Sequence, residues 1–149
     1  MAFAELERFI DVNQDMDDFT GGTDISEINS IEKELGCELP YSYKEFLKKY
    51  GSGGIFGVDI LGCTKAEIPS VIVQTKRYRE LGMPSHLVVV EDAGEYVYSL
   101  NTKSFHGEEC PVIVWDRSLG LDNESEAQSF DEFLLRRLTE AKENWDEDF

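Results

Sequence analysis

The spacing of apolar side chains divides the chain into segments with a helical period and segments that alternate or run continuously. In the helical segments, apolar residues recur every three to four positions and therefore share one face. The fourth such segment is the weakest, because it contains a run of β-branched residues. We predict helices over residues 2–11, 24–36, 40–50, 69–80 and 129–140.

Residues that start and end helices support these boundaries. Asp24 is followed by Glu27, and Ser129 by Glu132, at the spacing of a capping box. In a capping box, each side chain accepts a hydrogen bond from a backbone N–H that the helix leaves unpaired. Gly36 is suited to the left-handed conformation that ends many helices. The acidic tail over 141–149 is expected to fray beyond the last helix.

Four short apolar segments bounded by turn-forming residues predict strands, at 55–61, 87–91, 96–100 and 112–115. A longer loop over 101–109 separates the last two. Helices come first, strands follow and one helix closes the chain, without regular strand–helix alternation. This order predicts an α+β fold, a single domain over 1–149 with a largely antiparallel mixed sheet and helices packed on one face.

The charge of the chain limits its partners. The sequence has 31 acidic and 14 basic residues, which gives a net charge of −17. Such a chain repels nucleic acid and anionic membrane surfaces, so neither is an expected partner. With 41% apolar residues it is too hydrophobic for an acidic disordered tail. Its charge is also uneven, because residues 90–126 hold nine acidic against two basic residues, a net charge of −7.

Compartment signals favour a cytoplasmic protein. No apolar run approaches the roughly 20 residues that cross a bilayer. The N-terminus interleaves acidic and apolar residues and lacks the pattern of a secretory signal. Cys37, Cys63 and Cys110 are odd in number and widely spaced, so we expect reduced thiols and not a disulfide framework.

The motifs that usually carry catalysis are weak in this sequence. Residues 51–54 are rich in glycine, but they follow a helix, precede an extended segment and lack Gly-Lys-Ser/Thr, so a structural turn is favoured over a phosphate loop. His106, Glu108, Glu109 and Cys110 lie within five residues, yet no second ligand motif accompanies them for zinc. A nucleophilic pair of Cys110 and His106 has no specific spacing. We therefore expect no enzyme, no metal and no cofactor.

Residues 31–54 carry a family resemblance. Glu32-x-x-Leu35-Gly36 precedes Leu39-Pro40-x-x-Tyr43-Lys44-x-Phe46-Leu47 and a glycine-rich turn. This order resembles the signature of the SUKH superfamily of Smi/Knr-type domains. Residues 111–116 and 129–134 also lie where that family has a strand and a terminal helix, so the resemblance extends over about 24–140. Among its members, the acidic chain is similar to YobK-type bacterial immunity proteins.

The resemblance implies an α+β domain with a mixed sheet backed by helices. It also implies a role, because bacterial members are typically immunity proteins that bind a toxin domain in the cytoplasm, and many of these toxins are nucleases. Other members act as interaction scaffolds, which remains the alternative. The family supplies no catalytic residues to transfer to this chain.

An acidic immunity protein fits a basic toxin, because a nuclease needs positive potential to hold nucleic acid. The acid-rich strand half is the expected interface, although a solvated, solubilising surface would have the same composition. Trp115 offers an aromatic anchor within this region, or belongs to the core. The expected rim carboxylates are Glu91, Asp92, Glu95, Asp116, Asp122 and Glu124. The oligomeric state stays open.

Overall fold

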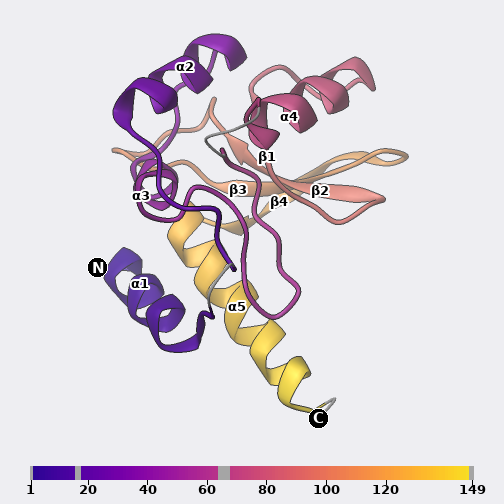
Figure 1. Cartoon of the computed structure of the whole chain (residues 1–149). Helices are drawn as coiled ribbons and strands as arrows, with labels where there is room; N and C mark the ends of the chain where they lie inside the picture. The colour runs from indigo at the N-terminus through magenta and orange to yellow at the C-terminus, as the bar shows by residue number, and fades with distance from the viewer. Residues whose placement is uncertain (1, 16–17, 64–67, 148–149) are drawn as a thin grey trace.

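The structure, a computed structural model, describes residues 2–15, 18–63 and 68–147, without the side chains of 2, 122–124, 146 and 147 (Figure 1). Its described part forms five helices and one four-stranded antiparallel sheet in the order β1-β2-β3-β4. The helices are α1 (Ala2–Asn13), α2 (Ile25–Leu35), α3 (Tyr41–Lys49), α4 (Ser70–Glu80) and α5 (Phe130–Glu147). The strands are β1 (Leu87–Asp92), β2 (Tyr96–Asn101), β3 (Val112–Asp116) and β4 (Gly120–Ala127). The predicted α+β class is confirmed.

Three predicted elements differ from the structure. Residues 55–61 form no strand, although Ile55, Val58 and Ile60 are buried. The apolar residues of this segment recur because the segment is a buried loop. One isolated β-bridge pairs Ile60 with Gly53. Strand β4 was not predicted from the sequence. The last helix extends beyond its predicted end at residue 140, because α5 continues to Glu147; residues 148–149 of the expected tail lie outside the described residues.

Asp24 and Gly36 cap α2 as predicted, with the Asp24 half of the expected capping box formed. The Asp24 carboxylate accepts a hydrogen bond from the Glu27 backbone N–H at 2.9 Å. Gly36 ends the helix at φ 66°, in the left-handed region that glycine adopts without a steric penalty. Between these caps, Ile28, Ile31 and Leu35 are buried along one face. Local sequence thus fixes both ends of this helix.

Helix α3 takes its N-terminal cap from a distant loop. It begins after Pro40, whose side chain makes no cap hydrogen bond. The carboxylate of Glu109, 67 residues from Ser42, accepts the Ser42 backbone N–H at 3.0 Å and the Ser42 hydroxyl at 2.8 Å. The Glu108 carbonyl accepts the Tyr41 N–H at 2.9 Å. Burial raises the pKa of Glu109, while both Ser42 hydrogen bonds oppose that rise.

The glycine-rich turn allows backbone segments to approach closely. A Cβ atom on Gly51 would lie 2.1 Å from the Gly21 carbonyl oxygen, and one on Gly54 would lie 1.8 Å from the Val58 carbonyl oxygen. Real Cβ atoms do not come so near to backbone oxygens. Glycine is therefore required at both positions because neighbouring backbone segments pack too closely for any side chain.

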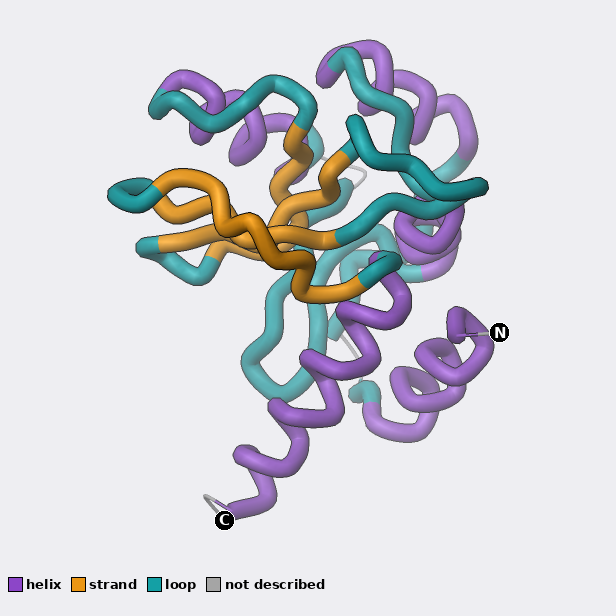
Figure 2. Tube along the Cα trace, turned by 180° about the vertical axis from the view of Figure 1, so that it is seen from behind, coloured by secondary structure: helices purple, strands orange, loops and turns teal. Residues whose placement is uncertain are grey.

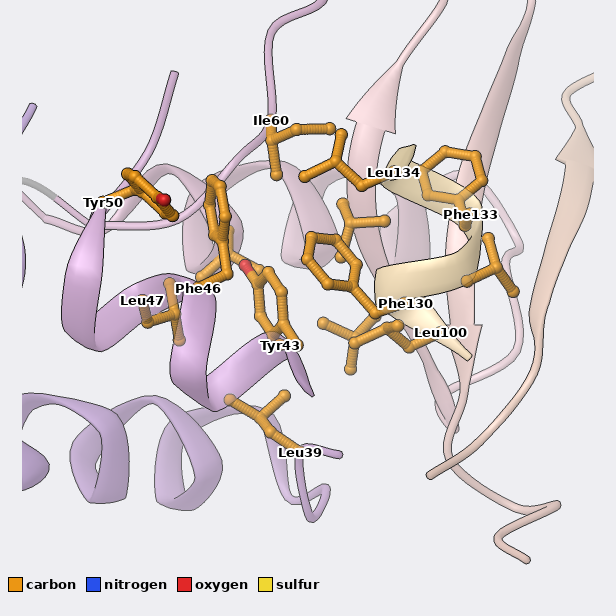
Figure 3. Close-up of a cluster of buried hydrophobic side chains, with 14 of the residues drawn as sticks. Leu39, Tyr43, Phe46, Leu47, Tyr50, Ile60, Leu100, Phe130, Phe133 and Leu134 are labelled. Carbon is orange, nitrogen blue, oxygen red and sulfur yellow. The ribbon is translucent and has the colours of Figure 1, made fainter. Parts of the chain in front are cut away.

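Two apolar clusters lie on opposite faces of the sheet, because successive strand residues point to opposite sides. One contains Val88 and Val90 of β1 together with α5 and α3, and its aromatic rings are visible in Figure 3. There, Phe130 of α5 contacts Tyr43 of α3 with ring centroids 4.9 Å apart. The other cluster contains Leu87, Val89, Tyr78 of α4 and residues of β2 and β3, and the start of α4 also reaches the first cluster through Val71 and Ile72. The expectation of helices on one face is corrected: α4 packs on the face opposite α5 (Figure 1).

Candidate interaction surface

A β-bulge in β1 decides where the first predicted rim residues point. The pairing of β1 with β2 shifts register between Val89 and Glu91. The extra residue reverses the alternation, so Glu91 faces α5 and Asp92 faces α4. Sequence alternation without the bulge would assign the two residues to the opposite faces.

Glu91 is not an exposed rim carboxylate. Its side chain is only 7% exposed. Its two carboxylate oxygens accept hydrogen bonds from Nε and Nη2 of Arg137 on α5, at 2.9 and 2.6 Å. The guanidinium also lies over the ring of Tyr98, 5.5 Å from its centroid. This bidentate pair connects the sheet to α5 and corrects the expected exposure of Glu91.

Trp115 belongs to the core on the α4 side. It is 6% exposed and makes an edge-to-face contact with Tyr78, with ring centroids 6.1 Å apart. The Tyr78 hydroxyl donates to Asp92 at 2.9 Å, and the other Asp92 carboxylate oxygen accepts the Gly94 N–H at 2.8 Å. Of the two interpretations left open for Trp115, the structure shows the core position. Asp92 remains an exposed residue.

Glu95 and Asp116 meet at the tips of two hairpins. The Arg117 backbone N–H donates to the Glu95 carbonyl oxygen at 3.1 Å, which joins the β1–β2 turn to the β3–β4 turn. The Asp116 carboxylate accepts the backbone N–H groups of Ser118 at 2.7 Å and Leu119 at 3.0 Å. These two hydrogen bonds lower the pKa of Asp116. The Asp116 carboxylate therefore closes the turn with two hydrogen bonds and stays ionised at neutral pH.

These tips line a shallow hollow of about 550 Å³ beside the end of α4. Leu119 is 87% exposed and Leu81 is 48% exposed, so apolar side chains stand next to the carboxylates. The sequence analysis predicted neither leucine as part of the surface. An apolar residue between Ser118 and Gly120 in a turn could have indicated Leu119. We call this region the hairpin-tip surface: Leu81, Glu95, Asp116, Arg117, Ser118 and Leu119.

Asp122 and Glu124, the two remaining rim residues, lie on β4, which begins directly after Leu119. Their side chains are outside the described part of the structure. Their backbone places them on the strand that leaves the hairpin-tip surface. The predicted acidic residues thus divide into Glu91, which is buried, and a group at or beside the hairpin tips.

The residues considered for catalysis have structural contacts. Nε2 of His106 lies 2.8 Å from the Gln128 carbonyl oxygen, and Glu109 caps α3. Cys110 is buried, and burial raises the pKa of its thiol to about 12. Among the described residues, no three His, Cys, Asp or Glu side chains are grouped so that they could hold a metal ion. Within the same ranges, no helix has both the length and the apolar character needed to cross a membrane.

Comparison with known proteins agrees with this fold. The model of the SMI1-KNR4 cell-wall family, SUKH_5, matches residues 6–139, which is most of the chain. The chain belongs to the SUKH superfamily. A crystal structure of a protein from Pseudomonas syringae pv. tomato is similar to this SUKH domain with a TM-score of 0.65. The two are 19% identical, and the similarity covers 89% of this chain and 92% of the other, so it shows the shared fold alone.

Proposed function

We propose that this SUKH domain is a cytoplasmic immunity protein that binds a basic toxin, of the nuclease class, and neutralises it by stoichiometric association without catalysis. The observation that carries the proposal is the hairpin-tip surface. It combines exposed leucines with carboxylates, one of which closes a turn through two backbone hydrogen bonds. Membership in the SUKH superfamily, in which immunity proteins are common, agrees with this role.

Physical arguments assign different tasks to the two kinds of side chain. Carboxylates such as Glu95, on a chain of net charge −17, attract a basic partner over long range and raise the association rate. The apolar Leu119 provides area that loses water on contact, which slows dissociation. The hydrogen bonds that Asp116 accepts from its own turn are expected to lower the entropy that is lost when a partner binds.

The test uses proteins encoded beside the gene as candidate toxins. Each candidate is mixed with the purified chain, and residual nuclease activity and complex stoichiometry are measured at two salt concentrations. We expect complete inhibition at a 1:1 ratio and slower association at higher salt, because salt screens exposed charges. Absence of binding by every neighbouring protein, together with capture of several housekeeping proteins, would support the scaffold alternative.

Variants then locate the interface. Glu95→Lys is expected to slow association severalfold at low salt and to leave dissociation nearly unchanged. Glu5→Lys is the matched control, because Glu5 is exposed on α1, below the sheet, and the change in net charge is the same (Figure 1). Leu119→Ala is expected to speed dissociation with little effect on stability, since Leu119 is exposed. Equal effects of Glu95→Lys and Glu5→Lys would remove the hairpin-tip surface from the interface.

A further inference from the structure

The loop over residues 53–59 has an unusual residue at the tip of its turn. Phe56 has φ 54° and Gly57 has φ 83°, and the Val58 N–H donates to the Ile55 carbonyl oxygen across them at 3.0 Å. Two consecutive residues with positive φ are the pattern of a type I′ turn, where Asn and Gly are preferred. Phenylalanine is disfavoured there, because its Cβ crowds the backbone. The backbone is therefore strained at the position that directs this aromatic ring.

The ring of Phe56 lies against Trp145, near the end of α5. Their ring centroids are 6.2 Å apart, and the ring planes are inclined by 54°. Figure 1 and Figure 2 both show the loop that follows α3 running alongside α5. Trp145 is 47% exposed and Phe56 is half-buried, so the pair presents aromatic surface to solvent. Exposed tryptophans of this kind are enriched where proteins bind partners.

The aromatic pair lines a hollow that also contains carboxylates. The hollow has a volume of about 480 Å³, within the range of roughly 300–1,000 Å³ that ligand-binding clefts have. Asp15, Asp18 and Asp59 line it together with both rings, and none of the described residues that line it is Lys or Arg. The Asp18 carboxylate is positioned by the Asp15 backbone N–H, which donates to it at 2.6 Å. Negative charge and aromatic faces therefore meet in one place.

The chain itself shows which side chain such a combination holds. The Arg137 guanidinium pairs with the Glu91 carboxylate and lies over the Tyr98 ring, 5.5 Å from its centroid. Arg137 also lines a second hollow, of about 220 Å³, that contains Phe56 and Trp145. A planar guanidinium can stack on an aromatic face while it pairs with a carboxylate, whereas an ammonium group is a compact and more strongly hydrated charge. The chemistry of the larger hollow thus favours arginine over lysine.

We propose that the hollow between the 53–59 loop and the end of α5 binds an arginine side chain of a basic partner protein. The guanidinium stacks on the Trp145 indole and pairs with the Asp59 carboxylate, and the Phe56 ring supports the indole. The described residues that line this hollow include none of those that line the hairpin-tip surface, so the two sites are separate. The inference goes beyond the proposed function, because the partner does not have to be a toxin.

The experiment uses the capped peptide Gly-Arg-Gly-Arg-Gly at physiological salt. One counterpart replaces arginine by lysine, which keeps the charge, and another replaces it by citrulline, which keeps the shape without the charge. Binding is followed by NMR through the indole N–H signals of the chain's two tryptophans, of which Trp115 is 6% exposed and serves as an internal control. We expect the Trp145 signal to shift saturably with the arginine peptide and the Trp115 signal to stay in place. The lysine peptide should bind about threefold more weakly, and the citrulline peptide should not bind.

Variants separate this hollow from general attraction to an acidic chain. Binding of a fluorescently labelled arginine peptide is measured by anisotropy. Asp59→Asn keeps the shape of the side chain and is expected to weaken binding about threefold. Glu95→Gln is the matched control, since Glu95 is also exposed and loses the same charge, and we expect almost no change. Trp145→Leu should weaken binding about threefold through the lost ring face. Phe56→Asn, which introduces a residue that the turn prefers, should keep the fold by circular dichroism and also weaken binding.

Three results would overturn the inference. Equal binding of the arginine and lysine peptides, or equal effects of Asp59→Asn and Glu95→Gln, would show adsorption by net charge. A Trp145 signal that does not move when the peptide saturates the chain would place the peptide elsewhere. Unchanged binding by folded Trp145→Leu and Phe56→Asn variants would remove the aromatic pair from the site. No toxin is present in these assays, so their outcome is independent of the immunity role.

Discussion

The ion pair between Glu91 and Arg137 gives the sharpest stability prediction. Arg137→Met removes the guanidinium but keeps most of the aliphatic chain that packs beside Tyr98. The Glu91 carboxylate, 7% exposed, then loses the two hydrogen bonds that compensate its burial. A buried charge without its partner is strongly destabilising.

The expected magnitude follows from the exposure of the pair. Breaking a fully buried pair costs about 3–5 kcal/mol, and the 28% exposure of the Arg137 side chain favours the lower end. We therefore expect Arg137→Met to lower the free energy of unfolding by about 3 kcal/mol. Glu91→Leu/Arg137→Met, which removes both charges, should cost about 1 kcal/mol or less, since replacing a buried pair by apolar residues is often nearly neutral.

Urea unfolding followed by circular dichroism measures these differences. The free energy of unfolding falls by about 2 kcal/mol per molar urea, so a loss of about 3 kcal/mol lowers the midpoint of urea unfolding by about 1.5 M. Arg136→Met is the matched control on the same helix. The Arg136 side chain is 43% exposed and pairs with Glu126 at 3.6 Å, so its loss should cost about 0.5 kcal/mol.

Two results would refute this reasoning. A difference between Arg137→Met and Arg136→Met that is smaller than the error of the measurement would mean that the Glu91–Arg137 pair contributes no more than a surface contact. Alternatively, the double variant could be as unstable as the sum of the single variants, and the two charges would then act independently.

Three further predictions concern single positions. Gly54→Ala should lower the free energy of unfolding, measured in urea, by more than about 3 kcal/mol, because the added Cβ meets the Val58 carbonyl oxygen. Gly57→Ala is the control: its Cβ has open space but its φ is 83°, so the loss should be about 1–2 kcal/mol. Burial raises the folded pKa of Glu109 above its ordinary 4.5, so ionising this carboxyl costs the folded chain more than the unfolded chain. As the pH rises from below 4.5 through the folded pKa, the free energy of unfolding of the native chain should fall relative to that of Glu109→Gln. Cys37 is half-buried, while the other two thiols are buried with raised pKa values, so a thiol reagent should label one cysteine rapidly and Cys37→Ser should abolish that phase.

Elements with strong local signals were predictable from the sequence. Asp24 and Gly36 cap α2 as their positions indicate, and the predicted strands over 87–91, 96–100 and 112–115 agree with β1, β2 and β3. Strand β4 was missed because Gly-Leu-Asp-Asn-Glu-Ser-Glu-Ala contains few residues with strand propensity. It forms because β3 provides a pairing partner, which is a tertiary cause.

The candidate surface was only partly predictable. Regional charge directed attention to Glu95 and Asp116, and the structure places both at the hollow of the hairpin tips. The burial of Glu91 follows from the β1 bulge and from Arg137, 46 residues later, and neither is visible in local alternation. Whether the surface binds a toxin stays a prediction.

The cap of α3 also bears on how the chain folds. Glu109 closes the first turn of this helix from 67 residues away, so α3 cannot gain that stabilisation until the β2–β3 loop has been synthesised and has docked. We therefore expect the apolar face of α3, which carries Phe46 and Tyr43, to reach its native packing only after later parts of the chain have been synthesised. On the ribosome, we expect the N-terminal half to remain incomplete until the sheet emerges, and the domain to fold as one cooperative unit.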